Sequence, residues 1–226
     1  MPATSPPVAV FGHRGSRRPG PENTVRAVRD ALAGGADGVE VDVRRAGERL
    51  VLAHGPGLEG AEPLGPVLDA ALGRRVICEV KNQPGQADFD APDCATAGQL
   101  VDLLRARAGI GQVDDVVVSS FDWASLELVR ALGGPPTAFL TPPGVALRAG
   151  AAYATEHGHA ELHPHWSSLT ARGVARVHGA GLRVVPWTAG STWHALALAR
   201  LRVDGVICDA PAEVVRAFSA HRRTAR

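Results

Sequence analysis

Two acidic residues, Glu40 and Asp42, stand two positions apart in the apolar run 38–43. Three valines alternate with them, which is typical of a β-strand whose apolar face packs on a core. A strand points alternate side chains to opposite faces, so both carboxylates share the polar face. Two like charges at this spacing repel each other unless a cation lies between them. The pair is therefore predicted to bind a metal ion, with an ordinary solvated strand face as the alternative.

The same spacing recurs in the apolar run 76–81, where Glu79 and Lys81 fall on one face of a strand. Glu79 would bring a third carboxylate to Glu40 and Asp42 if the two strands end in the same place. Three carboxylates form an oxygen site, which hard cations such as Mg²⁺ or Ca²⁺ prefer. A simple pair between Glu79 and Lys81 is the alternative, although these neighbours need a shared polar cavity in either case.

Basic and titratable residues follow the same strands. His13 and Arg14 come directly after an apolar run at 8–11, and His54 ends another at 50–53. Arg14 and Lys81 would place positive charge beside the metal, where they can bind an anion whose charge rises during reaction. The imidazole side chain can gain or lose a proton near neutral pH, so one of His13 and His54 can act as a general base and the other as a general acid.

The elements that must position these residues alternate between strands and helices along the chain. Strands are predicted at 8–11, 38–43, 76–81, 116–120, 137–140, 160–163, 183–188 and 204–209, and helices at 24–34, 64–72, 95–108, 123–132, 145–157, 167–179, 191–201 and 212–221. The helix at 167–179 is expected to begin at a cap formed by Ser167 or Ser168. The run at 50–53 follows the second strand too closely for a crossover helix and should pair with it as a hairpin.

Eight strand–helix units predict an α/β fold, a (β/α)8 TIM barrel with a short β-hairpin excursion after the second strand. An open doubly wound sheet is the alternative, but it would want a glycine-rich phosphate loop, and none is well formed. In such barrels the site lies at the carboxyl ends of the strands. His163 and Trp187 also stand at strand ends: His163 is expected to line the pocket, and Trp187 either packs in the barrel or forms a wall of the site.

Composition limits the other possibilities. The chain has 226 residues with 45% hydrophobic residues and a formal net charge of +1, which fits one domain over 1–226 and gives no reason to expect nucleic acid as a partner. Flexible tails are expected at 1–7 and 222–226. No run is long enough for stable membrane insertion, and no signal peptide is evident, so a cytoplasmic location is expected. Three cysteines at wide spacing suggest reduced thiols, and the oligomeric state stays open.

An ordered set of motifs resembles the glycerophosphodiester phosphodiesterase family over almost the whole chain. The set is His13-Arg14-Gly15, Pro21-Glu22-Asn23-Thr24, Glu40-Val41-Asp42-Val43, His54, Glu79-Val80-Lys81, Ser120-Phe121, Pro186-Trp187-Thr188 and Asp204-Gly205-Val206-Ile207-Cys208-Asp209-Ala210-Pro211. The resemblance implies a TIM barrel and metal-dependent hydrolysis of glycerophosphodiesters, small-molecule substrates, to glycerol 3-phosphate and an alcohol.

Carried over by position, the resemblance implies a role for each predicted site residue. Glu40, Asp42 and Glu79 would bind one divalent cation, His13 and His54 would transfer protons, and Arg14 and Lys81 would hold phosphate. Trp187 and His163 are expected to contact the substrate. Two alternatives remain: phospholipase D-like hydrolysis of lysophospholipids, and a catalytically weak barrel that binds a phosphorylated ligand.

Three departures from the family pattern bear on these expectations. Gly55 replaces the usual Asp after the second His, so His54 is expected to be held less firmly. Ala189-Gly190 replaces the frequent Val-Asn after Trp-Thr and removes an amide from the rim. The insertion after the second His is reduced to residues 55–75, which predicts an open pocket with a loose preference for the alcohol group.

Overall fold

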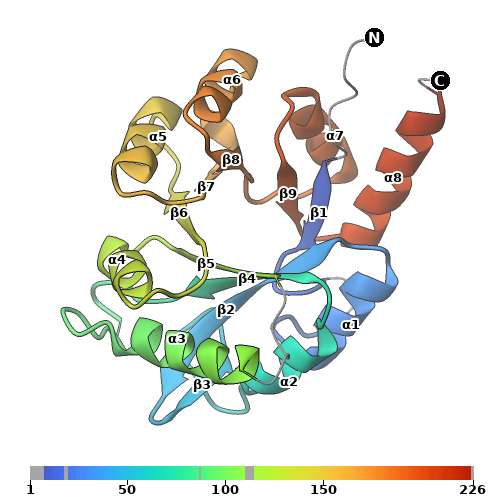
Figure 1. Ribbon diagram of the computed structural model, residues 1–226. Coiled ribbons are helices and arrows are strands. Elements are labelled where there is room, and N and C mark those ends of the chain that lie inside the picture. The colour runs from blue at the N-terminus through green and yellow to red at the C-terminus, as the bar shows by residue number, and fades with distance from the viewer. Residues whose placement is uncertain (1–7, 18–19, 87, 110–114, 225–226) are drawn as a thin grey trace.

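Eight parallel strands form the centre of the computed structural model, and helices surround them (Figure 1). The structure describes residues 8–17, 20–86, 88–109 and 115–224. Its strands are β1 (Ala9–Gly12), β2 (Gly38–Ala46), β3 (Arg49–Leu52), β4 (Arg75–Val80), β5 (Asp115–Ser120), β6 (Thr137–Thr141), β7 (Glu161–Pro164), β8 (Arg183–Val184) and β9 (Gly205–Cys208). The helices are α1 (Val25–Ala33), α2 (Leu64–Ala70), α3 (Ala95–Ala108), α4 (Trp123–Ala131), α5 (Leu147–Glu156), α6 (Ala171–Gly179), α7 (Thr192–Arg200) and α8 (Pro211–Thr224).

The strand order β8-β7-β6-β5-β4-β2-β1-β9 confirms a TIM barrel. Neighbouring strands in this order pair in parallel. Between β8 and β9, the two ends of this order, scattered backbone hydrogen bonds replace a regular ladder. Asp204 N, just before β9, donates to Val184 O of β8 at 2.9 Å, and Ala189 N, after β8, donates to Ile207 O of β9 at 2.9 Å. The barrel is therefore nearly closed, and the carboxyl ends of all its strands share one rim.

The predicted hairpin is present. β3 runs antiparallel to the end of β2, with Val43 opposite Leu52 and Ala46 opposite Arg49, and it stands off the barrel path. The amide of Ala53 then donates to the carbonyl of Asp42 at 3.2 Å. This return strand brings His54 back beside the carboxylates of β2.

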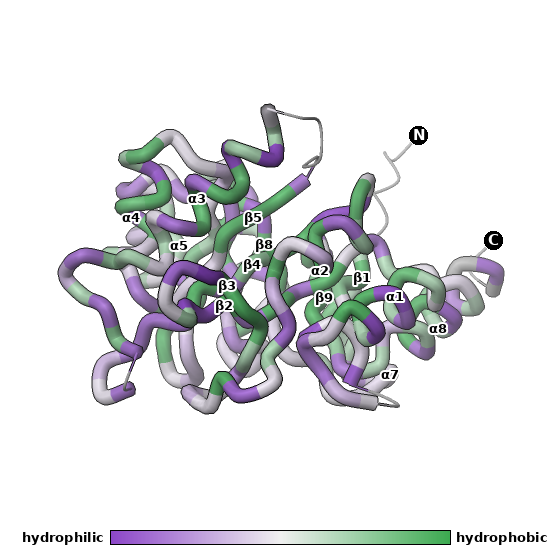
Figure 2. The backbone as a smooth tube through the Cα atoms, turned by 90° about the horizontal axis from the view of Figure 1, so that it is seen from below, coloured by the Kyte–Doolittle hydropathy of each residue, from purple (hydrophilic) through white to green (hydrophobic). Residues whose placement is uncertain are grey.

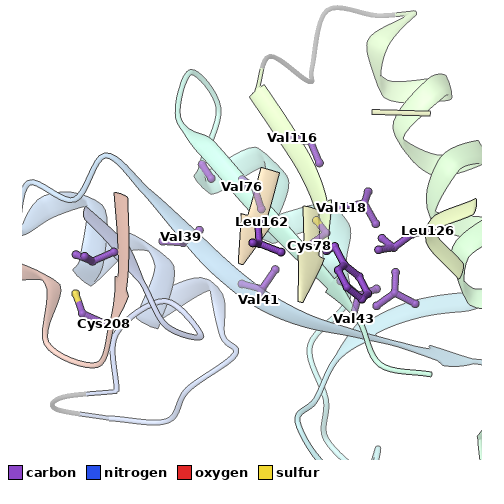
Figure 3. Close-up of a cluster of buried hydrophobic side chains, with 14 of the residues drawn as sticks. Val39, Val41, Val43, Val76, Cys78, Val116, Val118, Leu126, Leu162 and Cys208 are labelled. Atoms are coloured by element: carbon purple, nitrogen blue, oxygen red, sulfur yellow. The ribbon is translucent and has the colours of Figure 1, made fainter. Parts of the chain in front are cut away.

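Apolar side chains anchor the carboxylate-bearing strand from its outer face. Figure 3 shows the three valines of β2 in one buried cluster with neighbours from β4 and β5 and with Leu126 of α4. Each such buried side chain contributes on the order of 1.5–3 kcal/mol. In Figure 2 the green, apolar segments accordingly gather on the strands, whereas purple segments lie mainly on outer helices and loops. Burial of the valines leaves the alternate residues of β2 facing the barrel interior.

A second apolar layer fills the interior of the barrel below the site. It consists of Phe11, Ile77, Val117, Ala138, Val185 and Ile207. Beneath it, at the amino ends of the strands, Arg75 of β4 bonds to Glu161 of β7 at 2.7 Å. Glu161 is buried, which by itself raises its pKa, but bonding to His163 and the charges of Arg75 and Arg183 lower the pKa to about 2. The interior is thus apolar in the middle, with an ionic network at the amino end.

Several boundaries differ from the sequence-based expectations. Helix α6 begins after Thr170, whose side chain accepts from the amide of Gly173, while Ser167 and Ser168 lie in a short 3₁₀ turn. The expected serine cap was therefore wrong, because Thr170 has the extended backbone that a cap requires. Helix α8 continues to Thr224, into the expected tail, whereas 1–7 and 225–226 lie outside the described residues. No helix in the described part of the chain has the length and apolar character to cross a membrane.

Candidate active site

Three buried carboxylates meet at the carboxyl ends of β2 and β4. One oxygen from each of Glu40, Asp42 and Glu79 lies within 4.8 Å of the others. The parallel register sets Asp42 directly opposite Glu79, and alternation puts Glu40 on the same face. The predicted convergence of the three acidic residues is present, and their oxygens are close enough to share one cation.

The carboxylates are not equally easy to ionise. Burial, together with the charges of Asp42 and Glu79, raises the pKa of Glu40 well above its ordinary value. Burial also raises the pKa of Asp42, but contacts with His54, Lys81 and Arg14 outweigh it and lower that pKa. Asp42 is therefore the anionic centre of the cluster. Glu40 Oε2 accepts from the Arg14 amide, but its Oε1 has no hydrogen-bond partner.

Two cationic side chains border the carboxylates. Lys81 Nζ lies 2.6 Å from Glu79 and 3.0 Å from Asp42. Arg14 Nε lies 3.0 Å from Asp42, and the Arg14 amide donates to Glu40 Oε2 at 2.9 Å. These contacts raise the pKa of both basic groups despite burial, which by itself lowers it. Lys81 and Arg14 thus carry permanent positive charge beside the carboxylates, where an anionic group can be bound.

His13 follows β1 and contacts a carboxylate to which the sequence alone assigned no role. Its Nδ1 lies 2.7 Å from Asp209 Oδ1, after β9. Arg17 Nη1 approaches the same oxygen at 3.4 Å. Although burial raises the pKa of Asp209, His13 and Arg17 lower it overall. The Asp209 carboxylate orients the His13 ring, which leaves Nε2 as the nitrogen that can exchange a proton.

His54 lies on the other side of the cluster, at the end of the hairpin. Its side chain is 51% exposed, and its Nδ1 lies 3.4 Å from Asp42 Oδ2. Gly55 beside it is exposed, and a Cβ at that position would meet nothing within 4 Å. The structure thus brings His54 to the carboxylates of β2, with no side chain at position 55 to orient it.

Trp187 and His163 occupy different depths. Trp187 is half-buried on the rim: its indole donates to the His163 carbonyl at 3.1 Å, and its ring packs edge-on against Phe121. His163 has no exposed surface, and its Nε2 lies 2.9 Å from Glu161. The Trp187 ring therefore lies on the rim, whereas the His163 ring lies within the barrel. His159 is also buried, and its ring stacks against Phe139.

The loop that follows Arg14 supports the site, a role that the sequence alone did not assign to it. Asn23 donates to Asp42 Oδ2 at 2.8 Å and accepts from the Asp42 amide at 3.1 Å. Glu22 holds Arg14 at 2.5 Å. Asn23 thus holds Asp42 in place, and Glu22 holds Arg14. Position in the Pro-Glu-Asn-Thr motif was the only signal available for this role.

A nearly closed parallel barrel with carboxylates, basic groups and histidines on the rim at its carboxyl ends is the architecture of a TIM-barrel enzyme. Comparison with known proteins narrows this class. The model of the glycerophosphoryl diester phosphodiesterase family matches residues 13–64 and 61–213. The chain belongs to this family of phosphoric diester hydrolases.

Individual relatives agree with this assignment. A glycerophosphodiester phosphodiesterase from Caldanaerobacter subterraneus subsp. tengcongensis is 26% identical over 91% of this chain and 96% of its own length. Among solved structures, a phosphodiesterase from Oleispira antarctica in complex with the product sn-glycerol-3-phosphate has a TM-score of 0.76 at 23% identity, covering 93% of this chain and 96% of that one. A glycerophosphodiester phosphodiesterase from Thermotoga maritima has a TM-score of 0.74 at 20% identity, covering 92% and 96%. These structures share the fold of this chain.

Proposed function

We propose that this chain hydrolyses glycerophosphodiesters to glycerol 3-phosphate and an alcohol, and that it requires a divalent cation. The observation that carries the proposal is the meeting of Glu40, Asp42 and Glu79 within 4.8 Å, with cationic side chains bound to the same carboxylates. A phosphodiester is an anion whose charge rises as phosphorus is attacked, and such a site stabilises that charge.

The donor set suits a hard cation. Glu40 Oε1 is buried and without a hydrogen-bond partner, and burial together with the charges of Asp42 and Glu79 raises the pKa of Glu40. Glu40, Asp42 and Glu79 would hold Mg²⁺ or Ca²⁺, which prefer oxygen ligands. When bound, the cation would polarise a phosphoryl oxygen and neutralise charge on it.

Arg14 and Lys81 would hold the phosphate. Arg14 Nη1 donates to Glu22, and Nε lies 3.0 Å from Asp42 without forming a hydrogen bond, so the planar guanidinium keeps N–H donors for phosphate. Lys81 contributes a compact charge from between Asp42 and Glu79. Together they would orient the phosphate against the carboxylate cluster.

The two histidines would move protons from separate positions. His13 is held at Nδ1 by Asp209 and has Nε2 available, so it can take or give a proton in a fixed orientation. His54 is half exposed and can exchange protons with water or with the leaving alcohol. The Trp187 ring would form a wall of the site beside the substrate. His163 would hold that ring in place, because its backbone carbonyl accepts the hydrogen bond from the indole.

A substrate panel with and without metal tests the proposal. We expect glycerol 3-phosphate release from glycerophosphocholine to stop with EDTA and to return with Mg²⁺ or Ca²⁺. Glu40→Gln and His13→Ala should each lose about 10²-fold or more in kcat while still folding. Glu127→Gln, which removes a half-buried carboxylate of α4 outside the cluster, should keep the wild-type kcat. Activity that ignores chelation would refute metal dependence.

The same panel separates the alternatives. Preferential turnover of lysophosphatidylcholine would favour phospholipase D-like hydrolysis over the proposed activity. A calorimetric titration that shows binding of glycerophosphocholine without product would instead favour a catalytically weak binding barrel.

A further inference from the structure

Arg44 is a fully buried cation just beyond the carboxylate cluster. It lies two residues after Asp42 on β2, and its side chain is 0% exposed. A guanidinium without water must satisfy its N–H donors with protein acceptors. The identity of those acceptors shows what Arg44 holds.

Two of the acceptors are backbone carbonyls in the segment that carries His54. Arg44 Nε donates to Ala53 O at 3.2 Å, and Nη2 donates to His54 O at 3.0 Å. The Ala53 amide is bound as well, to Asp42 O at 3.2 Å. The backbone on both sides of the His54 α-carbon is therefore fixed to β2 by three hydrogen bonds.

The other two acceptors lie in the loop that follows β4. Arg44 Nη1 donates to Asp88 Oδ2 at 2.5 Å, and Nη2 donates to Gln86 Oε1 at 2.6 Å. This loop begins directly after Lys81. The Arg44 guanidinium thus connects the end of the hairpin, at His54, to the loop that follows Lys81.

His54 needs such a backbone restraint because its side chain makes few contacts that could hold the ring in place. The ring is 51% exposed and approaches Asp42 at 3.4 Å. Gly55 has no side chain, and the space around it is open. Holding the carbonyl of His54 limits how far the ring can move from Asp42.

We propose that Arg44 is a positioning residue that keeps the His54 imidazole in place for proton transfer. The inference rests on the proposed function, in which His54 transfers a proton. Because Arg44 acts on the backbone of His54 and touches no substrate, its loss should lower kcat more than it changes KM.

A double-mutant cycle tests this coupling. Wild type, Arg44→Met, His54→Ala and the double variant are assayed with glycerophosphocholine and metal, after the folded fraction has been checked by circular dichroism. Arg107→Met is the matched control, because Arg107 pairs with Asp69 between α3 and α2, away from the site. We expect Arg44→Met to lower kcat by about 10- to 100-fold with KM within about threefold of wild type. The control should keep the wild-type kcat.

The cycle also separates this inference from the proposed function. If Arg44 acts through His54, the double variant will be about as slow as His54→Ala alone. The positioning role would be overturned if the decreases in kcat of the two single variants multiplied in the double variant, or if a folded Arg44→Met kept the wild-type kcat. Either result would leave the proposed function intact. Wild-type activity in His54→Ala would overturn the role of His54 and this inference with it. If Arg44→Met does not fold, Arg44→Lys, which retains the buried charge, takes its place in the cycle, and the same outcomes test the positioning role.

Discussion

His13 Nδ1 lies 2.7 Å from Asp209 Oδ1, a contact between residues 196 positions apart in the sequence. β1 and β9 pair in parallel, with Gly12 opposite Cys208, so the residues that follow them are neighbours on the rim. The segment after the last strand therefore supplies the carboxylate that orients the histidine after the first strand. This contact depends on barrel closure, and it makes the closure part of the site.

Asp209→Asn should lower kcat by about 10- to 100-fold, because an amide cannot balance the charge of a protonated His13. Arg17→Gln is the control for the surrounding charge, since Arg17 reaches the same oxygen at 3.4 Å, and it should have a smaller effect. Steady-state kinetics with matched thermal unfolding curves distinguish a kinetic loss from unfolding. A wild-type kcat in Asp209→Asn would remove this carboxylate from the mechanism.

Divalent cations should stabilise the folded protein independently of activity. A ligand that binds only the folded state at about 100 times its Kd adds about 2.7 kcal/mol. We therefore expect Mg²⁺ or Ca²⁺ to raise the Tm of chelator-treated protein, and Glu40→Gln to abolish most of that rise. Glu127→Gln, which removes a carboxylate of α4 outside the cluster, should keep the rise in Tm. An identical rise in Glu40→Gln and wild type would place cation binding elsewhere.

Burial of His159 should make stability depend on pH below neutrality. Burial lowers the pKa of His159 from 6.5 to about 4, with Arg130 and His157 adding to the effect and Glu127 opposing it. Between pH 6.5 and pH 4 the unfolded chain binds a proton at His159 that the folded chain excludes. The contribution of His159 to the free energy of unfolding is therefore fully present above pH 6.5 and is lost as the pH falls toward 4. It amounts to about 3 kcal/mol at most.

Urea unfolding at a series of pH values checks this prediction. His159→Gln can keep a contact to Thr137, which bonds to His159 Nδ1 at 2.8 Å. Its free energy of unfolding should fall less steeply than that of wild type between pH 6.5 and 4. Parallel curves for the two proteins would contradict the prediction.

Gly12→Ala should disrupt the site from the end of β1. A Cβ at Gly12 would overlap the backbone carbonyl of Gly15, so the turn that carries His13 and Arg14 would have to move. We expect a loss of at least about 10²-fold in kcat together with lower stability. Gly190→Ala, where a Cβ meets nothing within 4 Å, is the matched control and should behave like wild type. Equal kinetics for the two variants would show that the turn tolerates displacement.

Local pattern predicted the parts of the molecule that depend on near neighbours. Alternation of valines with Glu40 and Asp42 identified both the strand and its polar face, because side-chain direction in a strand follows a period of two. The same argument applied to Glu79 and Lys81, and the succession of strands and helices predicted the barrel. Cys78 and Cys208 are buried and reduced, as their apolar runs indicated.

The sequence by itself therefore determined the strands, their polar faces and the residue types brought to one rim. Only the tertiary structure decided which partners those residues meet: Asp209 at His13, Asn23 at Asp42, and Arg44 behind His54. It also decided depth, since His163 lies inside the barrel and His54 at its surface. The physical reason is that these contacts join loops far apart in sequence, and their distances follow from strand register and barrel closure.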